Sequence, residues 1–157
     1  MSEGMIPINA EDLPIDSVPM EESSVYNGYL RKATISPKLS KKDVLYCALQ
    51  LEVADGDYEG RTVMLNYLPL PVGISPDASK AQRIKIQEQN QAFGRFVKAF
   101  KISGRIPSVS LSNPDSLTAW QAWIEPFYDK VGKFTIRNQE FPEGSGRLRS
   151  SVSDFVF

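Results

Sequence analysis

The chain has 157 residues, of which 41% are apolar and 24% are charged, values that are ordinary for one globular domain with a hydrophobic core. No stretch approaches the roughly 18 consecutive apolar residues of a membrane span, and residues 1–20 contain neither a basic residue nor the apolar core of a secretory signal. The single cysteine, Cys47, excludes an internal disulfide, and we expect it to be a buried hydrophobe in a reducing, cytoplasmic compartment.

Charge is divided unevenly along the chain. The acidic segment, residues 1–24, contains six acidic residues and no basic one, which leaves 13 acidic against 18 basic residues in 25–157, a net charge of +5. Because the acidic segment is rich in proline and serine and has no hydrophobic period, we expect an irregular arm, 1–24, followed by one domain, 25–157. Such an arm suggests a polyanion-binding body that it partly shields, and an arm that only aids solubility fits equally well.

Three strands are predicted in the first half of the chain, at residues 25–35, 44–53 and 61–70. The second has the clearest alternation, with Tyr46, Gln50 and Glu52 on one side and an apolar face on the other, formed by Leu45, Cys47, Leu49, Leu51 and Val53. In the turn that follows, Gly56 and Gly60 stand where a positive φ is expected. The third strand stops near Pro69 and Pro71, which cannot donate a ladder hydrogen bond.

The period changes to that of a helix in the next segment. Ser79 is the expected N-cap of a helix over 80–102, whose apolar stripe consists of Phe93, Phe96, Val97 and Phe100. A second, shorter helix is predicted after Asn113 and is broken or kinked by Pro126. Two further strands, 133–141 and 148–157, close the chain around a turn rich in glycine.

Five strands, with helix between the third and the fourth, are the layout of a small closed barrel. We therefore predict a mainly β fold, a five-stranded OB-like barrel with helices inserted between strands three and four. Barrels of this class mostly bind extended ligands, above all single-stranded nucleic acid.

Catalytic residue patterns are missing from the sequence. The chain has no histidine, which removes the usual general base and the commonest zinc ligand, and one cysteine cannot form a thiolate metal site within a single chain. Asp55, Asp57 and Glu59 alternate in a turn but are too few for an EF-hand loop, so we interpret them as a solvated hairpin. We expect no enzyme activity, no cofactor and no metal site.

The sequence does contain the residue types of a nucleic-acid-binding surface. An OB-like barrel binds on strands two and three and on the loops that join strands one to two and four to five. Cations there would contact phosphates, and aromatic rings would stack on bases. The candidate binding residues are Lys38, Lys41, Lys42, Tyr46, Arg61, Tyr67, Arg137, Arg147 and Arg149. For each of them alone, a solvated charge or partial core packing is the better explanation, and only the presence of cations in both expected loops makes the binding surface an equal alternative.

Four short patterns carry a resemblance to a family. They are Leu49-Gln50-Leu51-Glu52-Val53, Asp55-Gly56-Asp57-Tyr58-Glu59-Gly60-Arg61, Phe93-Gly94-Arg95-Phe96 and Val131-Gly132-Lys133-Phe134. With them the chain resembles, over residues 25–157, phage-encoded single-stranded-DNA-binding proteins of the OB-fold type. The resemblance implies a DNA-binding barrel without catalysis. Many such proteins end in an acidic tail tipped by an aromatic residue, whereas Ser153–Phe157 has one acid and a strand-like pattern, which puts the recruitment of a partner by Phe157 in doubt.

The sequence thus leads to the hypothesis of sequence-tolerant binding and protection of single-stranded DNA, in phage replication or recombination, in the cytoplasm of the infected bacterial host. RNA stays open as the ligand, as do a homo-oligomer or phage replication and recombination proteins as partners. Two alternatives remain: a phage assembly subunit that uses the barrel for protein contacts, and a small inhibitor or adaptor whose acidic segment mimics nucleic acid.

Overall fold

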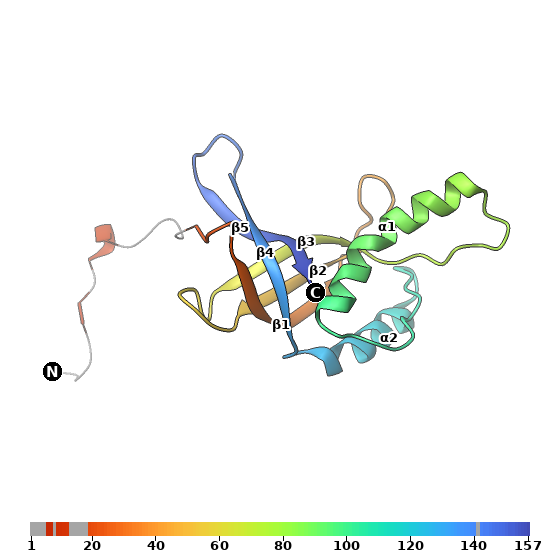
Figure 1. Ribbon diagram of the computed structural model, residues 1–157, viewed down its shortest axis with the longest axis horizontal. Coiled ribbons are helices and arrows are strands. Elements are labelled where there is room, and N and C mark those ends of the chain that lie inside the picture. Colours follow the sequence, from red (N-terminus) through yellow and green to blue (C-terminus); the bar gives the residue numbers. More distant parts are fainter. Residues whose placement is uncertain (1–5, 8, 13–18, 141) are drawn as a thin grey trace.

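The computed structural model describes residues 6–7, 9–12, 19–140 and 142–157, and Figure 1 shows a barrel with helices to one side. Five strands form the barrel: β1 (Val25–Ile35), β2 (Tyr46–Val53), β3 (Thr62–Pro69), β4 (Val131–Glu140) and β5 (Leu148–Val156). Between β3 and β4 the chain forms α1 (Lys80–Ala99), α2 (Pro114–Ile124) and the 3-10 helix η2 (Glu125–Phe127), and η1 (Ala10–Asp12) precedes the barrel. The predicted fold class, an OB-like barrel with inserted helices, is confirmed. Phe141, the expected end of the fourth strand, lies outside the described residues, as do residues 1–5, 8 and 13–18.

The strand order around the closed barrel is β1-β2-β3-β5-β4, with β4 returning to β1. All neighbouring strands are antiparallel except β3 and β5, which run parallel and pair through Met64 and Ser151. The outer surface of β3 therefore continues onto that of β5 at this point.

The inner face of β2 is the one that its alternation predicts. Every second residue from Cys47 to Val53 is buried. Tyr46 and the residues that alternate with the buried ones are partly exposed. The strand begins at Tyr46 and not at residue 44, because the backbone N–H of Ser40 donates to the carbonyl of Val44 and closes a turn there. After β2, Gly56 and Gly60 have the expected positive φ angles of 80° and 86°.

Two glycines face each other across β1 and β4 and make room for aromatic rings. Gly28 pairs with Gly132. A Cβ at Gly28 would lie 2.5 Å from the ring of Phe134, and one at Gly132 would lie 2.7 Å from the ring of Phe100. Contacts this short do not occur between real carbon atoms, so the close approach of backbone and ring requires glycine at both positions.

The second half of α1 packs against the barrel. Phe93, Phe96 and Phe100 are buried, and the ring centroid of Phe155 on β5 lies 5.6 Å from that of Phe96. The helix starts with a capping box between Ser79 and Gln82 and ends at Ala99, three residues before the predicted end. Lys101 adopts a positive φ of 54°, and the N–H of Ile102 donates to the carbonyl of Val97. This Schellman-type end satisfies the last helical carbonyls and turns the chain away.

The α2 helix supplies the other large aromatic of the core. Trp120 is buried, lies 6.0 Å from Phe93 between ring centroids, and donates its indole N–H to the carbonyl of Ala33 on β1. The helix ends at Ile124 and continues as η2, which contains Pro126, because proline lacks the N–H that an α-helical turn needs.

The last residues of the acidic segment belong to the packing of the barrel. Met20 is 1% exposed and lies in the core. Its backbone N–H donates to the hydroxyl of Ser150, and its carbonyl accepts from the side chain of Asn138. The carboxylate of Glu22 accepts the backbone N–H of Asn138 at 2.6 Å. Met20 and Glu22 therefore lie against β4 and β5, next to the strand ends that carry candidate binding residues.

Candidate nucleic-acid interface

The β1–β2 loop, residues 36–45, presents three exposed lysines on a fixed backbone. The hydroxyl of Ser40 accepts the N–H groups of Lys42 and Val44 at 3.3 Å and 3.1 Å, and Asp43 takes a positive φ of 58°. A short hydroxyl side chain that bonds its own backbone is typical of such turns. Lys38, Lys41 and Lys42 are exposed around it.

The two tyrosines predicted to stack on bases lie against each other. Tyr46 begins β2 and Tyr67 lies near the end of β3, and their ring centroids are 4.8 Å apart at an interplanar angle of 47°. Tyr67 is 46% exposed, and it lines the same groove as Lys42. We call Tyr46 and Tyr67 the tyrosine pair. Tyr46 is partly exposed and Tyr67 is exposed, so the pair presents aromatic surface to a ligand.

The arginines of the last two strands share the outer face of one hairpin. Arg137 on β4 pairs with Ser151, and Arg149 on β5 pairs with Gln139, so the two arginines are diagonal neighbours. Side chains of directly paired residues point to the same face, and the buried Ile136 and Val152 mark the other. Arg147 lies in the turn that joins the strands, residues 142–147.

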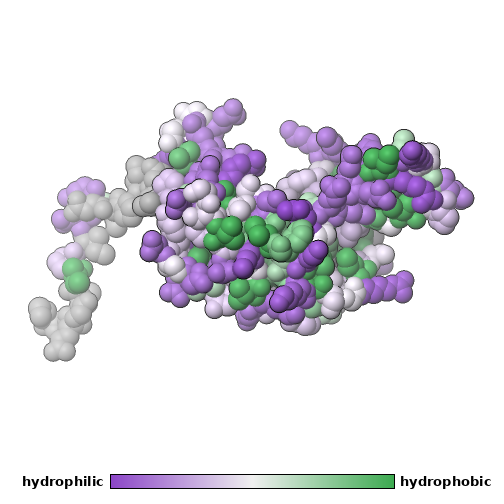
Figure 2. Space-filling view, viewed as in Figure 1, coloured by the Kyte–Doolittle hydropathy of each residue, from purple (hydrophilic) through white to green (hydrophobic). Residues whose placement is uncertain are grey.

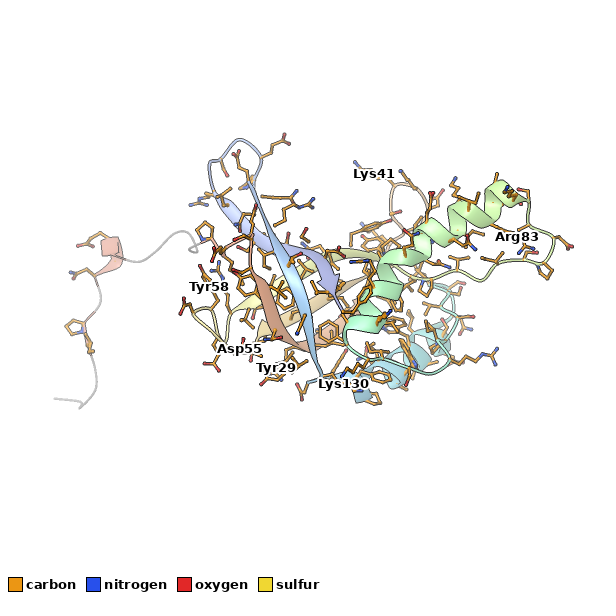
Figure 3. All side chains as sticks on the ribbon, viewed as in Figure 1. Tyr29, Lys41, Asp55, Tyr58, Arg83 and Lys130 are labelled. Carbon is orange, nitrogen blue, oxygen red and sulfur yellow. The ribbon has the colours of Figure 1, made fainter. Side chains whose placement is uncertain are left out.

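The β1–β2 loop and the turn between β4 and β5 flank one hollow of the surface. Figure 2 shows it at the top of the molecule, between the projection of the β4–β5 hairpin and the projection of the β1–β2 loop. Figure 3 places Lys41 on the second of these projections and Tyr29 and Lys130 at the opposite end of the barrel. The two loops that the sequence selects therefore border the same depression.

Arg61 does not join this group. Its carbonyl accepts the N–H of Val53 at the hairpin end of β2, and its guanidinium lies 5.7 Å from the ring centroid of Tyr58. Arg61 and Tyr67 are six positions apart along an extended backbone, or roughly 20 Å at about 3.3 Å per residue. The structure thus assembles the loop lysines with the tyrosine pair and places Arg61 at the other end of β3.

Two cations of α1, Arg95 and Lys98, contact the end of the chain at and after β5. Arg95 on α1 donates to both carboxylate oxygens of Asp154, at 2.8 Å and 3.0 Å, and to the carbonyl of Phe155. The hydrogen bonds from Arg95 lower the pKa of Asp154 below its ordinary value. The ring centroid of Phe157 lies 4.9 Å from the guanidinium carbon of Arg95 and 4.6 Å from Nζ of Lys98. These contacts hold the end of the chain against α1, so Arg95 and Lys98 stabilise the fold.

Sequence reasoning missed residues that complete the surface around the tyrosine pair. Gln50 on β2 and Met64 and Asn66 on β3 are partly or fully exposed near the pair, and Met64 pairs with Ser151 of β5. The alternation of β2 places Gln50 on the side of Tyr46, but nothing in the sequence brings Met64 to Ser151.

A second missed group is an ion-pair network at the other end of the barrel. Arg31 donates to Glu52 at 2.9 Å and to Asp129, and its guanidinium lies 4.6 Å from the ring centroid of Tyr29. These two carboxylates raise the pKa of Arg31 above its ordinary value. The network joins β1, β2 and the segment that leads into β4, and because Arg31 and Asp129 are far apart in sequence, only the fold reveals it.

Comparison of the chain with protein-family models and with curated protein sequences finds no match. Within the described residues, no group of three or more potential metal-ligating side chains comes together. In the same part of the chain, no helix has the length and apolar character that crossing a membrane requires.

Proposed function

We propose that this protein binds single-stranded DNA without sequence preference and protects it, and that the tyrosine pair and the β1–β2 loop form the centre of the binding surface. The observation that carries the proposal is the open tyrosine pair beside a rigid loop with three exposed lysines. Aromatic rings stack on any base and lysines contact any phosphate, so this combination suits a strand of arbitrary sequence.

The geometry of the tyrosine pair favours one manner of stacking. A base inserted between two rings would hold them roughly 7 Å apart, twice the 3.4 Å spacing of stacked bases. The observed centroid separation of 4.8 Å leaves no such space. Bases would therefore stack on the outer surface of the pair, with the phosphates directed to the lysines of the loop on one side and to Arg137 and Arg149 across the hollow on the other.

The biological setting follows from the resemblance to phage single-stranded-DNA-binding proteins. On this proposal the protein acts in phage replication or recombination, in the cytoplasm of the infected cell, where exposed single strands need a cover that does not read sequence. Proteins of phage replication or recombination would be its partners, and no catalytic step is assigned to it.

The first prediction concerns the affinity for a labelled oligothymidylate, measured by fluorescence anisotropy at several salt concentrations. We expect Tyr67→Ala to weaken binding by about five- to 150-fold, because one base stack contributes about 1–3 kcal/mol. Tyr67→Phe keeps the ring and should bind like the wild type. Lys41→Ala should lower the slope of log K against log salt by about 0.7, the value for one phosphate contact on a single strand.

The matched controls are Tyr29→Ala and Lys130→Ala, which remove the same side chains from the opposite end of the barrel (Figure 3). Both should leave the affinity unchanged. A wild-type protein that binds no oligonucleotide at low salt would disprove the function, and equal effects of Tyr29→Ala and Tyr67→Ala would disprove the position of the surface. A uridine oligonucleotide of the same length measures the preference between DNA and RNA.

A further inference from the structure

The first half of α1 projects from the barrel together with the segment that leads into it (Figure 1). We call residues 71–91 the helical arm. The buried residues of α1 are Phe93, Phe96 and Ala99, all of them after the arm. The arm thus adds a helix of more than two turns to the molecule without contributing a buried side chain of α1 to the core. A helix of this length is marginal in water by itself, so its order needs another cause.

Side-chain hydrogen bonds hold the helical arm at both ends. At its base, Asn90 accepts from the N–H of Val72 and donates to the carbonyl of the same residue, both at 2.9 Å. At its tip, Arg83 donates to the carbonyls of Pro76 and Ala78 at 2.9 Å and 3.2 Å. These hydrogen bonds hold the helical arm in a fixed position as a rigid projection.

Apolar side chains are exposed on this rigid projection. Val72 is 47%, Ile74 36% and Ile84 46% exposed. Single apolar residues on a surface need no explanation, but three on one projecting element that is fixed in position mark a contact surface. The charges of the arm do not favour nucleic acid, because Asp77 and Glu88 offset most of its basic residues and Arg83 is engaged by carbonyls.

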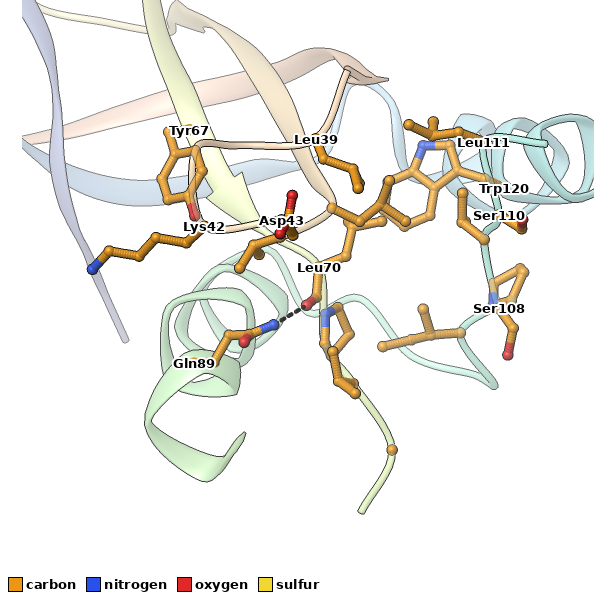
Figure 4. Close-up of a pocket in the computed structure, with 18 of the residues that line it drawn as sticks. Leu39, Lys42, Asp43, Tyr67, Leu70, Gln89, Ser108, Ser110, Leu111 and Trp120 are labelled. Atoms are coloured by element: carbon orange, nitrogen blue, oxygen red, sulfur yellow. Dashed lines mark hydrogen bonds between the residues drawn. The ribbon is translucent and has the colours of Figure 1, made fainter. Parts of the chain in front are cut away.

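A groove runs along the helical arm on the same molecule (Figure 4). Its walls come from the β1–β2 loop, the base of the arm and residues 106–112, and Gln89 and Leu70 are hydrogen-bonded across its floor. The apolar residues that line it include Leu39, Val72, Ile106, Val109, Leu111 and Trp120. Its volume of about 1410 Å³ exceeds the roughly 300–1,000 Å³ of small-molecule sites. Two turns of a helix about 10 Å wide occupy roughly 850 Å³, so the groove has room for a helical segment.

The groove is lined by equal numbers of basic and acidic residues. The pair on α1, one basic and one acidic, could bind the same pair on a second copy of the chain. The four charged residues of the lining are Lys42, Asp43, Lys85 and Glu88. Lys85 and Glu88 lie one turn apart on the side of α1 that faces the groove, and Ile84 shares the face of Glu88 one turn earlier. If two such helices lie antiparallel about a two-fold axis, each Lys85 stands opposite the partner's Glu88.

We propose that the protein self-associates into a two-fold dimer in which the helical arm of each copy lies in the groove of the other. A projecting apolar ridge and an apolar groove that are adjacent on one chain are the two halves of an isologous contact. The Lys85 and Glu88 pairs set the antiparallel register, and Ile84, one residue before Lys85, supplies an apolar contact on the outer side of each pair. The inference goes beyond DNA binding, and its test does not depend on it, because Ile84, Lys85 and Glu88 lie outside the tyrosine pair and its loops. Lys42 and Tyr67 of the proposed DNA surface also line the groove, so the two surfaces overlap there.

The test is sedimentation equilibrium of the full chain, without DNA, up to about 100 µM, where a dimer with a Kd of about 10 µM is mostly associated. We expect Ile84→Glu to abolish the dimer over this range. Lys85→Glu and Glu88→Lys should each raise the Kd by about tenfold or more, because a two-fold contact turns two attractive pairs into repulsive ones. The double variant Lys85→Glu/Glu88→Lys should dimerise like the wild type.

Mixing the two single variants gives the sharpest outcome. One chain then carries two acids and the other two lysines at these positions, so the mixture should form a heterodimer although neither variant dimerises well alone. A folding defect cannot produce this rescue. Lys133→Glu, an equal change of charge on β4, is the control and should leave the Kd unchanged. A wild-type chain that stays monomeric at all concentrations, or single variants that mixing and the double change fail to restore, would overturn the proposal.

Discussion

Cys47 illustrates how the barrel interior acts on a single side chain. It lies on the inner face of β2 with no exposed surface, and burial raises the pKa of its thiol to about 12. The prediction that this cysteine is a buried hydrophobe is confirmed. A thiolate there would lose its hydration without gaining a partner, so the folded state keeps the proton.

The raised pKa predicts a loss of stability at alkaline pH. In the unfolded chain the thiol titrates near about 8.5–9, so below that pH both states are protonated and the thiol does not change the free energy of unfolding. Between about pH 9 and pH 12 only the unfolded state releases the proton, and stability falls by up to about 1.4 kcal/mol per pH unit. Urea titrations at about pH 8 and pH 10 should show that the wild type loses about 1–2 kcal/mol more than Cys47→Ala does. Equal losses in the two proteins would show that the thiol ionises freely in the folded state.

At the scale of elements, several strands and helices follow from local pattern alone. The alternation of β2 and the phenylalanine stripe of α1 predict which faces are buried, because each period maps directly onto one side of its element. Element ends are less predictable. The end of α1 depends on the positive φ of Lys101, a conformation that any non-glycine residue adopts only when the surrounding fold demands it.

Alanine substitutions at two glycines, one in α1 and one in β4, should change the stability in opposite directions. Gly94 lies on the exposed side of α1, and a Cβ there would meet no atom within 4 Å, so Gly94→Ala should raise the free energy of unfolding by about 1 kcal/mol through helix propensity. Gly132→Ala places the same methyl group 2.7 Å from the ring of Phe100 and should lower it by about 1–3 kcal/mol. Thermal and urea unfolding measure both. A destabilising Gly94→Ala would mean that this face of α1 is covered.

At the scale of the whole molecule, the acidic segment and the barrel are joined across a long stretch of sequence. Met20 fills a place in the core, and Asn138 bonds both Met20 and Glu22. The predicted boundary between arm and domain, at residues 24 and 25, therefore cuts through a set of core contacts.

Two truncations test where the domain begins. Removal of residues 1–24 deletes the Met20 side chain from the core and should cost about 2–5 kcal/mol, the range for truncating a buried methionine. Removal of residues 1–18 keeps Pro19–Glu22 and should lower Tm much less. Met20→Ala in the full chain is the matched control and should reproduce most of the larger loss. Similar Tm values for the two truncations would place the boundary after residue 24.

The barrel, its helical insertion, the buried face of β2 and the cations of the β1–β2 and β4–β5 connections can be predicted from the sequence, because they depend on local periods, turn residues and the order of elements along the chain. The fold in three dimensions brings the tyrosine pair together, places Arg61 at the far end of β3 and buries Met20 in the core. It also brings together the β1–β2 loop, the base of the helical arm and residues 106–112, which enclose one groove. Each of these depends on contacts between residues far apart in sequence, whose geometry is fixed by the closure of the barrel and by the packing of aromatic rings against it.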